Sequence, residues 1–134
     1  DKYVQVENSR FSDEIHYSRT KIDKDIAQIK IPPLVIQPLV ENAIWHGLAP
    51  LNGKTKELII YFDQQKNQLI VEDNGIGLKQ AEVKDSKRKI KRDSLGINNI
   101  KERLVCFNRE YDKNYSLTLR EKESKDGTKA ILQF

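Results

Sequence analysis

Residues 37–47 read QPLVENAIWHG, and this stretch is the most informative part of the sequence. Its apolar residues recur at i, i+1, i+4 and i+5, which predicts a helix with one side turned toward a sheet. Asn42, Trp45 and His46 should share the other side, with Glu41 at its border, because residues three and four apart occupy one helix face. The stretch therefore predicts a helix that is packed on one side and polar on the other.

Prolines and a glycine indicate where this helix begins and ends. Pro32 and Pro33 fit the first turn of a helix, where a missing N–H breaks no hydrogen bond. Pro38 lies far enough inside to disturb a backbone hydrogen bond, so a bend or a late helix start is expected there. Gly47 fits the C-terminal cap, and Pro50 follows shortly after it.

The remaining elements follow from apolar alternation and turn residues. Segments 57–63 and 68–73 are separated by four polar residues and predict a β-hairpin. Ser94 fits the N-cap of a second long helix, whose apolar positions up to residue 107 keep a helical spacing. The polar and charged segment before it is expected to be mobile. Three further strands are predicted: residues 14–22, 115–122 and 128–134.

Composition limits the class of protein. The 134 residues are enough for one domain, and 33% charged with 37% apolar residues is typical of a globular chain. No run of 18 apolar residues occurs, and the first residues lack a signal-peptide pattern, so we expect a soluble fragment. Cys106 is the only cysteine, which excludes an intrachain disulfide and a cysteine-based metal site.

Two glycine-containing segments have the character of a ligand site. Asp73-Asn74-Gly75-Ile76-Gly77 follows a predicted strand, so a carboxylate lies where glycines let the backbone approach a ligand. Asp73 is able to accept a hydrogen bond from the exocyclic amine of adenine, although the segment is also an ordinary turn signal. Ser94-Leu95-Gly96-Ile97 opens a helix whose N–H groups suit a triphosphate, and a cap with a packing glycine explains it equally well.

Polar residues elsewhere offer complementary chemistry. The amide oxygen of Asn42 is a hard ligand suited to Mg²⁺, and Glu41 is placed to accept a proton from a nucleophile near a γ-phosphate. The hydroxyl of Thr128 could join a water network around the carboxylate of Asp73, and His46 could touch phosphate or ribose. Each residue taken alone also fits a solvated or structural position.

Together the segments ENAIWHG, DNGIGL and SLGINN resemble the three boxes of the GHKL ATPase superfamily, over nearly the whole chain. The strings IPPLVIQPLVENAIWHG and SLGINNIKERL look most like the catalytic and ATP-binding domain of LytS-like sensor histidine kinases. The resemblance implies an α+β fold, the two-layer Bergerat sandwich, with about five mostly antiparallel strands in a mixed sheet against about three helices. It also implies that residues 1–11 end an upstream dimerisation and phosphoacceptor segment, and that 12–134 form the ATP-binding domain.

The resemblance assigns a role to each motif residue. Asn42 would be the magnesium ligand, Glu41 the candidate base or polarising residue, and Asp73 the adenine reader supported by Thr128. Glycines would shape the site and a mobile lid over residues 78–95. The expected ATP-binding residues are Asn42, His46, Asp73, Gly75, Gly77, Leu78, Ser94, Leu95, Gly96, Ile97 and Thr128.

The chain departs from the family pattern at three points. Trp45 stands where relatives often have a basic residue that reaches the phosphates. Ser94 occupies the first glycine position of the third box. The phosphoacceptor motif is not found, because neither His16 nor His46 has its sequence context.

The leading hypothesis is an ATP-Mg-binding domain of a dimeric histidine autokinase from a bacterial inner-membrane sensor. It would position the γ-phosphate for transfer to a histidine in an upstream segment and then to a response regulator, and it would be nearly inactive alone. Its partners would be the upstream helices, a second copy and the regulator, with membrane contact only through other segments.

Two alternatives remain from the sequence. One is an ATP-hydrolysing switch in which Glu41 activates water, although the short lid and small size argue against it. The other is a degenerate docking module, which Trp45 and Ser94 favour. Nucleic acid is not expected as a partner, because the basic run 84–92 lacks interleaved aromatic residues and a recognition helix; a solvated loop, or steering of nucleotide charge, explains that run.

Overall fold

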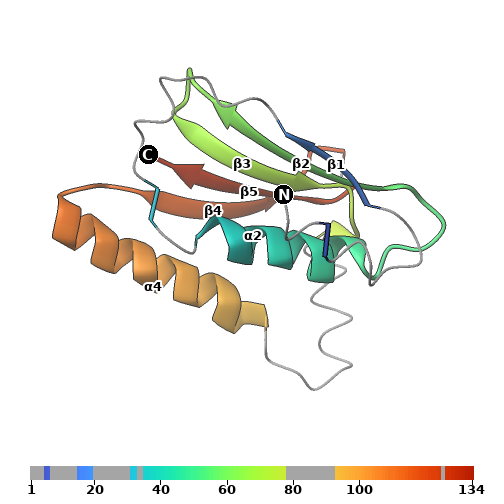
Figure 1. Ribbon diagram of the computed structural model, residues 1–134, viewed down its shortest axis with the longest axis horizontal. Helices are drawn as coiled ribbons and strands as arrows, with labels where there is room; N and C mark the ends of the chain where they lie inside the picture. Colours follow the sequence, from blue (N-terminus) through green and yellow to red (C-terminus); the bar gives the residue numbers. More distant parts are fainter. Residues whose placement is uncertain (1–4, 7–14, 20–30, 33–34, 78–92, 125) are drawn as a thin grey trace.

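Five strands form a single sheet among the residues described by the computed structural model, which are 5–6, 15–19, 31–32, 35–77, 93–124 and 126–134 (Figure 1). The spatial order is β1-β2-β3-β5-β4. Their bounds are β1 Ile15–Arg19, β2 Lys56–Asp63, β3 Gln68–Asp73, β4 Ser116–Glu121 and β5 Thr128–Gln133.

The sheet is mixed and mostly antiparallel. β2 and β3 form the predicted hairpin, in which Leu58 lies opposite Asp73. β4 and β5 form a second antiparallel pair, and β5 joins it to β3, also antiparallel. Only β1 is parallel to its neighbour, β2. This arrangement places the C-terminal end of β3 beside the N-terminal end of β5.

Helices cover one face of this sheet (Figure 1). The α-helix α2 (Ile36–Asn42) continues directly into a π-helical segment, η2 (Ala43–Leu48). α4 (Asp93–Tyr111) lies beside α2 and also covers β4. The predicted two-layer α+β fold is confirmed. Of the expected three helices, the described residues contain α2 with its η2 extension and α4, besides helical residues at positions 5, 6 and 77.

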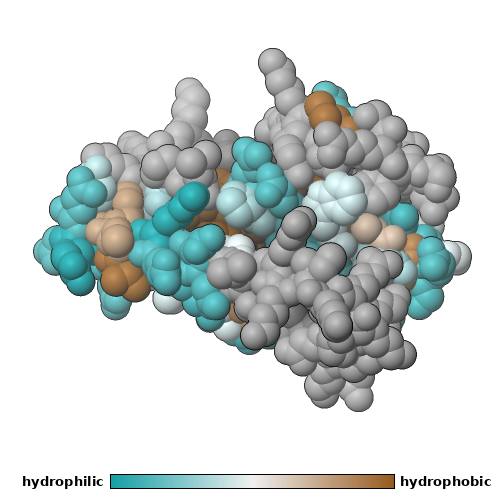
Figure 2. All heavy atoms as spheres, turned by 90° about the horizontal axis from the view of Figure 1, so that it is seen from below, coloured by the Kyte–Doolittle hydropathy of each residue, from teal (hydrophilic) through white to brown (hydrophobic). Residues whose placement is uncertain are grey.

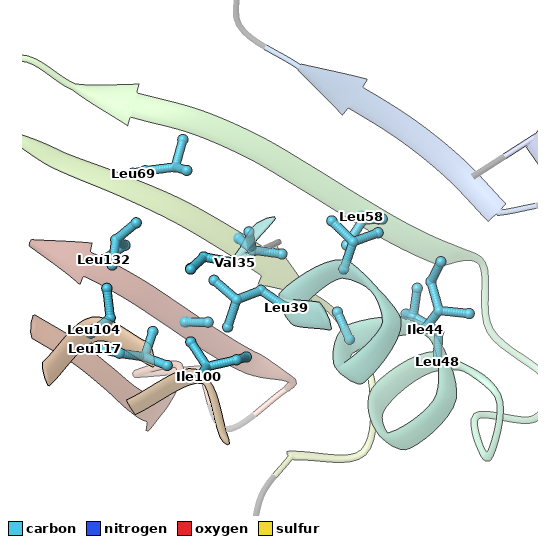
Figure 3. Close-up of a cluster of buried hydrophobic side chains, with 14 of the residues drawn as sticks. Val35, Leu39, Ile44, Leu48, Leu58, Leu69, Ile100, Leu104, Leu117 and Leu132 are labelled. Atoms are coloured by element: carbon cyan, nitrogen blue, oxygen red, sulfur yellow. The ribbon is translucent and has the colours of Figure 1, made fainter. Parts of the chain in front are cut away.

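The hydrophobic core fills the space between the helices and the sheet (Figure 3). Burial of each large aliphatic side chain stabilises the fold by roughly 1.5–3 kcal/mol, so the two layers are held together mainly by this interface. The residues labelled in Figure 3 are Val35, Leu39, Ile44, Leu48, Leu58, Leu69, Ile100, Leu104, Leu117 and Leu132.

The first helix begins later than its leading prolines suggest. Pro32 is irregular, Pro33 lies outside the described residues, and α2 starts at Ile36. Pro38 is therefore in the first turn, where backbone N–H groups have no intrahelical acceptor. The late start expected from Pro38 is confirmed, and a start at Pro32 is wrong.

The predicted helix ends also need correction. Gly47 is not the C-cap, because η2 continues to Leu48 and is capped by Ala49. α4 begins at Asp93, so Ser94 lies in its first turn and not at the predicted cap position. Among strands, the described part of the 14–22 prediction is β1.

Several predictions lie outside the described residues. They concern the boundary near residue 11, Leu78 and nearly all of the lid, and the basic run 84–92. Within the described part, no helix is both long and apolar enough for a membrane span. Seen from the helix side, the described surface is mostly hydrophilic with small hydrophobic groups (Figure 2).

Candidate functional site

The candidate site lies where the end of β3 meets the end of the first helix. Asp73 is the last residue of β3, and the glycine-containing turn after it runs against η2. The backbone N–H of Ile76 donates a hydrogen bond of 3.1 Å to the carbonyl oxygen of Gly47. Segments far apart in the sequence are therefore joined at this point.

The carboxylate of Asp73 is buried and only partly satisfied. The residue is 3% exposed, and its Oδ1 accepts hydrogen bonds from the backbone N–H groups of Gly75 (2.8 Å) and Thr128 (3.3 Å). Within the described ranges, no group donates to Oδ2. Because a buried acceptor without a donor is costly, this oxygen is available to accept a further hydrogen bond.

Burial raises the pKa of Asp73 to about 6. The two backbone hydrogen bonds and the nearby charge of Lys122 lower this pKa, while the charge of Glu72 adds to the increase. Desolvation of the charged form is thus the largest effect on the group. Carboxylates perturbed in this way are common at functional sites, and a donating ligand would favour the ionised form.

Three glycines pack around Asp73. A Cβ on Gly47 would lie 2.5 Å from Oδ1 of Asp73. A Cβ on Gly75 would overlap the backbone of Gly47, and one on Gly127, whose φ is +104°, would overlap the carbonyl oxygen of Asp73. Gly47 is thus a glycine because the carboxyl group of Asp73 occupies the space that a side chain would fill.

The turn after Asp73 is fixed to β2 by Asn74. Its Oδ1 accepts a hydrogen bond from the N–H of Glu57, and its Nδ2 donates to the carbonyl oxygen of Thr55, both at 2.8 Å. Gly77 then adopts a left-handed φ of +77°, which favours glycine. These contacts hold the position of the turn independently of any ligand.

The predicted polar residues of the first helix lie on the same continuous segment as Gly47. Asn42 ends α2 and is half-buried, and its side chain has no hydrogen-bond partner among the residues described. Glu41 accepts a 3.0 Å hydrogen bond from Nε2 of Gln37. Trp45 is 43% exposed, and His46 is half-buried. At roughly 1.5 Å per residue, Asn42 lies within two turns of the contact with Asp73.

The residues of the third motif lie at the start of α4. The backbone of Ser94 and Leu95 is helical. Gly96 is exposed with open space around it, and Ile97 packs against the hydrophobic core. Their predicted contact with phosphate stays a prediction.

Sequence reasoning missed three contributors to the site: Gly47, Asn74 and Gly127. Gly47 and Gly127 had local explanations as a cap and a turn residue, and Asn74 was taken only as part of a turn. For Thr128, the structure shows the backbone N–H as the donor to Asp73, whereas the sequence suggested its hydroxyl. The available signal for Gly127 was its position directly before a predicted strand, whereas Gly47 and Asn74 had no such signal.

Solved structures give the class of the fold. The blue-light activated histidine kinase of Erythrobacter litoralis EL346 superposes with a TM-score of 0.57 at 15% identity, covering 99% of this chain and 38% of that one. Its histidine kinase domain gives a TM-score of 0.55 at 14% identity, covering 99% of this chain and 56% of that one. The fold is that of a histidine kinase domain. No family profile matches the chain.

Sequence relatives indicate which group of histidine kinases the chain is similar to. YwpD, an uncharacterized protein of Bacillus subtilis, is 38% identical over 107 residues, which are 78% of this chain and 38% of YwpD. The sensor protein LytS of Oceanobacillus iheyensis is 36% identical over 80 residues, 58% of this chain and 13% of that protein. The sensor histidine kinase YesM of B. subtilis is 27% identical over 134 residues, covering 97% of this chain and 21% of YesM.

The chain is thus a homologue of the LytS-like sensor histidine kinases, which confirms the resemblance seen in the sequence. It spans less than two fifths of the length of these three relatives.

Proposed function

We propose that this chain is the ATP-Mg-binding catalytic domain of a two-component sensor histidine kinase. The observation that carries the proposal is the buried carboxylate of Asp73, whose Oδ2 receives no hydrogen bond from the described protein residues. The exocyclic amine of adenine would donate to this oxygen. Guanine presents a carbonyl oxygen at the same position and would be repelled, so the site should prefer adenine nucleotides.

Asn42 would hold the magnesium ion together with phosphate oxygens and water. The described residues contain no group of three or more His, Cys, Asp or Glu side chains arranged for a metal. A resident metal cage is therefore not supported there, whereas an ion that arrives with the nucleotide needs only one or two protein oxygens. When bound, the ion would neutralise phosphate charge.

The protein's own residues would mainly orient the nucleotide. Asp73 would fix the base, while Glu41, one residue before Asn42, would polarise or deprotonate the attacking nucleophile. That nucleophile is proposed to be a histidine in another segment of the full-length protein. The full-length protein would be a homodimer, with this domain on the cytoplasmic side, and would pass the phosphate to a response regulator. Because phosphoryl transfer depends on alignment and charge stabilisation, the domain alone should be nearly inactive.

Calorimetry with ATP and Mg²⁺ tests the nucleotide site. We expect binding by the wild type, and Asp73→Asn should weaken it by about 1–2 kcal/mol, the scale of a charge-assisted hydrogen bond. Asp63→Asn is the matched control, because Asp63 ends β2 at the opposite end of the sheet, where its Oδ1 accepts from the N–H of Lys66. No binding at millimolar nucleotide would leave only a docking module, and an unchanged affinity in Asp73→Asn would remove Asp73 from the site.

A second experiment separates the kinase from an ATP-hydrolysing switch. The full-length protein is incubated with ATP, and its phosphoprotein is tested for the acid lability and base stability of phosphohistidine. Steady ATP hydrolysis without such a phosphoprotein would contradict the kinase and favour the switch.

A further inference from the structure

Gly47 lies directly against the carboxyl group of Asp73. The three atoms nearest to a Cβ built on Gly47 are Oδ1 at 2.5 Å, Cγ at 2.8 Å and Oδ2 at 3.1 Å, all of Asp73. Any side chain at this position would therefore have to displace the carboxyl group.

The π-helical geometry of η2 brings Gly47 to this place. The segment contains the wide turn in which the N–H of Ala49 donates to the carbonyl oxygen of Ile44 at 2.7 Å. The carbonyl oxygen of Gly47 is left to accept the 3.1 Å hydrogen bond from Ile76. π-helical turns of this kind often occur at functional sites, and this one joins the helix to the turn that follows Asp73.

The carboxyl group of Asp73 is consequently held from three sides. The N–H groups of Gly75 and Thr128 fix Oδ1, and the Cα of Gly47 closes a further side without competing for either oxygen. Oδ2 is the oxygen left for a ligand. We propose that Gly47 is a positioning residue for base recognition. Because glycine has no side chain, the carboxylate of Asp73 keeps the orientation in which Oδ2 accepts a hydrogen bond from the amine of adenine.

This inference rests on the proposed nucleotide function, and base selectivity tests it. Calorimetry on the 134-residue chain would measure the affinities for ADP and for inosine diphosphate, which has a carbonyl oxygen in place of the amine. We expect the wild type to favour ADP by about tenfold or more, as for one charge-assisted hydrogen bond. In Gly47→Ala this ratio should fall to about one, because the displaced carboxylate no longer reads the amine.

Gly53→Ala is the matched control. Gly53 has a φ of +73° and no atoms near its Cβ position, so alanine strains the backbone there without touching Asp73. Its ratio of ADP to inosine diphosphate affinity should equal that of the wild type. A loss of selectivity that merely follows reduced stability would appear in this variant too, and would overturn the inference.

A double variant tests whether any loss of stability in Gly47→Ala comes from the contact with Asp73. Alanine is favoured over glycine inside helices, so a loss of stability would have to come from the contact with Asp73. Thermal unfolding should show that Gly47→Ala lowers the midpoint in the wild-type background but not in an Asp73→Ala background. A similar decrease in both backgrounds would contradict the contact and the inference with it.

The remaining outcomes distinguish the two proposals. If the wild type binds ADP selectively and folded Gly47→Ala keeps the same ratio, only the role of Gly47 is overturned. If the wild type binds neither nucleotide, the proposed function and the role of Gly47 in it are both refuted.

Discussion

The two ends of the sheet are built from opposite kinds of residue. At the glycine end, Gly47, Gly75 and Gly127 pack around Asp73. At the aromatic end, rings from β2 and α4, from the residue before β4 and from the residue after β5 form a continuous chain among the described residues. Their centroid distances are 5.8 Å for Phe62–Phe134, 5.1 Å for Phe134–Tyr115, 5.4 Å for Tyr115–Phe107 and 4.7 Å for Phe107–Tyr111.

This contrast separates the proposed site of ligand recognition from the part of the sheet that ring packing stabilises. The glycine end lacks side-chain atoms, lets backbones approach and leaves one buried carboxylate oxygen without a donor from the described part of the chain. The aromatic end fills its space with rings, each pair of which adds about 0.5–1.5 kcal/mol beyond the burial of area. One end of the sheet therefore carries the proposed ligand site at a cost in stability, and the other supplies stability.

The largest expected effect is that of an added methyl group at the glycine end. Gly75→Ala would place a Cβ on the backbone of Gly47, so we expect a loss of about 3 kcal/mol or more in the free energy of unfolding. Gly53→Ala is the control, with a loss of only about 1 kcal/mol from its left-handed backbone. Urea denaturation measures both, and equal losses would show that the glycine end is no more crowded than a surface loop.

The ionised carboxylate of Asp73 at the glycine end should lower the free energy of unfolding. The folded-state pKa of Asp73, about 6, is above the ordinary 3.8, so its favourable contribution is full below pH 3.8 and is lost as the pH rises through 6. At about 1.4 kcal/mol per pH unit, ionisation costs at most about 3 kcal/mol. Asp73→Asn should therefore stabilise the protein by about 2 kcal/mol at pH 8 and by much less at pH 4.

Urea denaturation of the wild type and Asp73→Asn between pH 4 and 8 measures this gain. A gain that is the same at pH 4 and pH 8 would contradict the proposed cost of the buried charge.

Removal of a ring at the aromatic end should lower stability without weakening ADP binding. Phe134 contacts the rings of Phe62 and Tyr115, so Phe134→Ala should lower the free energy of unfolding by about 2 kcal/mol. Its affinity for ADP should equal that of the wild type at a temperature where both are folded. Weakened binding without a loss of stability would show that the two ends are not separate in function.

The smallest effects should come from an asparagine at each end. Asn74 makes its two hydrogen bonds to the backbone of Thr55 and Glu57, and Asn108 bonds both backbone groups of Tyr115 at 2.8 Å. Asn74→Ala and Asn108→Ala should each cost about 1 kcal/mol of stability. Only Asn74→Ala should also weaken ADP binding in calorimetry, and an equal effect of Asn108→Ala would argue against a local role.

The strands were predictable because their signals are local. The apolar run of residues 69–71 with its polar flanks predicted the bounds of β3 directly, and the polar residues before it predicted the hairpin. The pattern of the first helix likewise predicted which residues face the core. Such periodicities depend on neighbours along the chain, so a single sequence contains them.

The errors arose where distant segments meet. Gly47 has the local character of a helix cap, whereas the helix continues past it to Leu48 and the space of its side chain is taken by Asp73. The backbone donor at Thr128 depends on the pairing of β3 with β5, which a local pattern does not specify. The roles of Asn42 and Glu41 stay predictions, because they depend on a ligand as well as on the chain.

The position of Trp45 has a practical consequence. It is the only tryptophan of the chain, it is 43% exposed, and it lies between Asn42 and Gly47 on the same helical segment. Fluorescence excited at the red edge of the protein absorption band therefore comes from this one indole. A change in its emission upon addition of a ligand would report on the segment that carries the proposed site, in unlabelled protein.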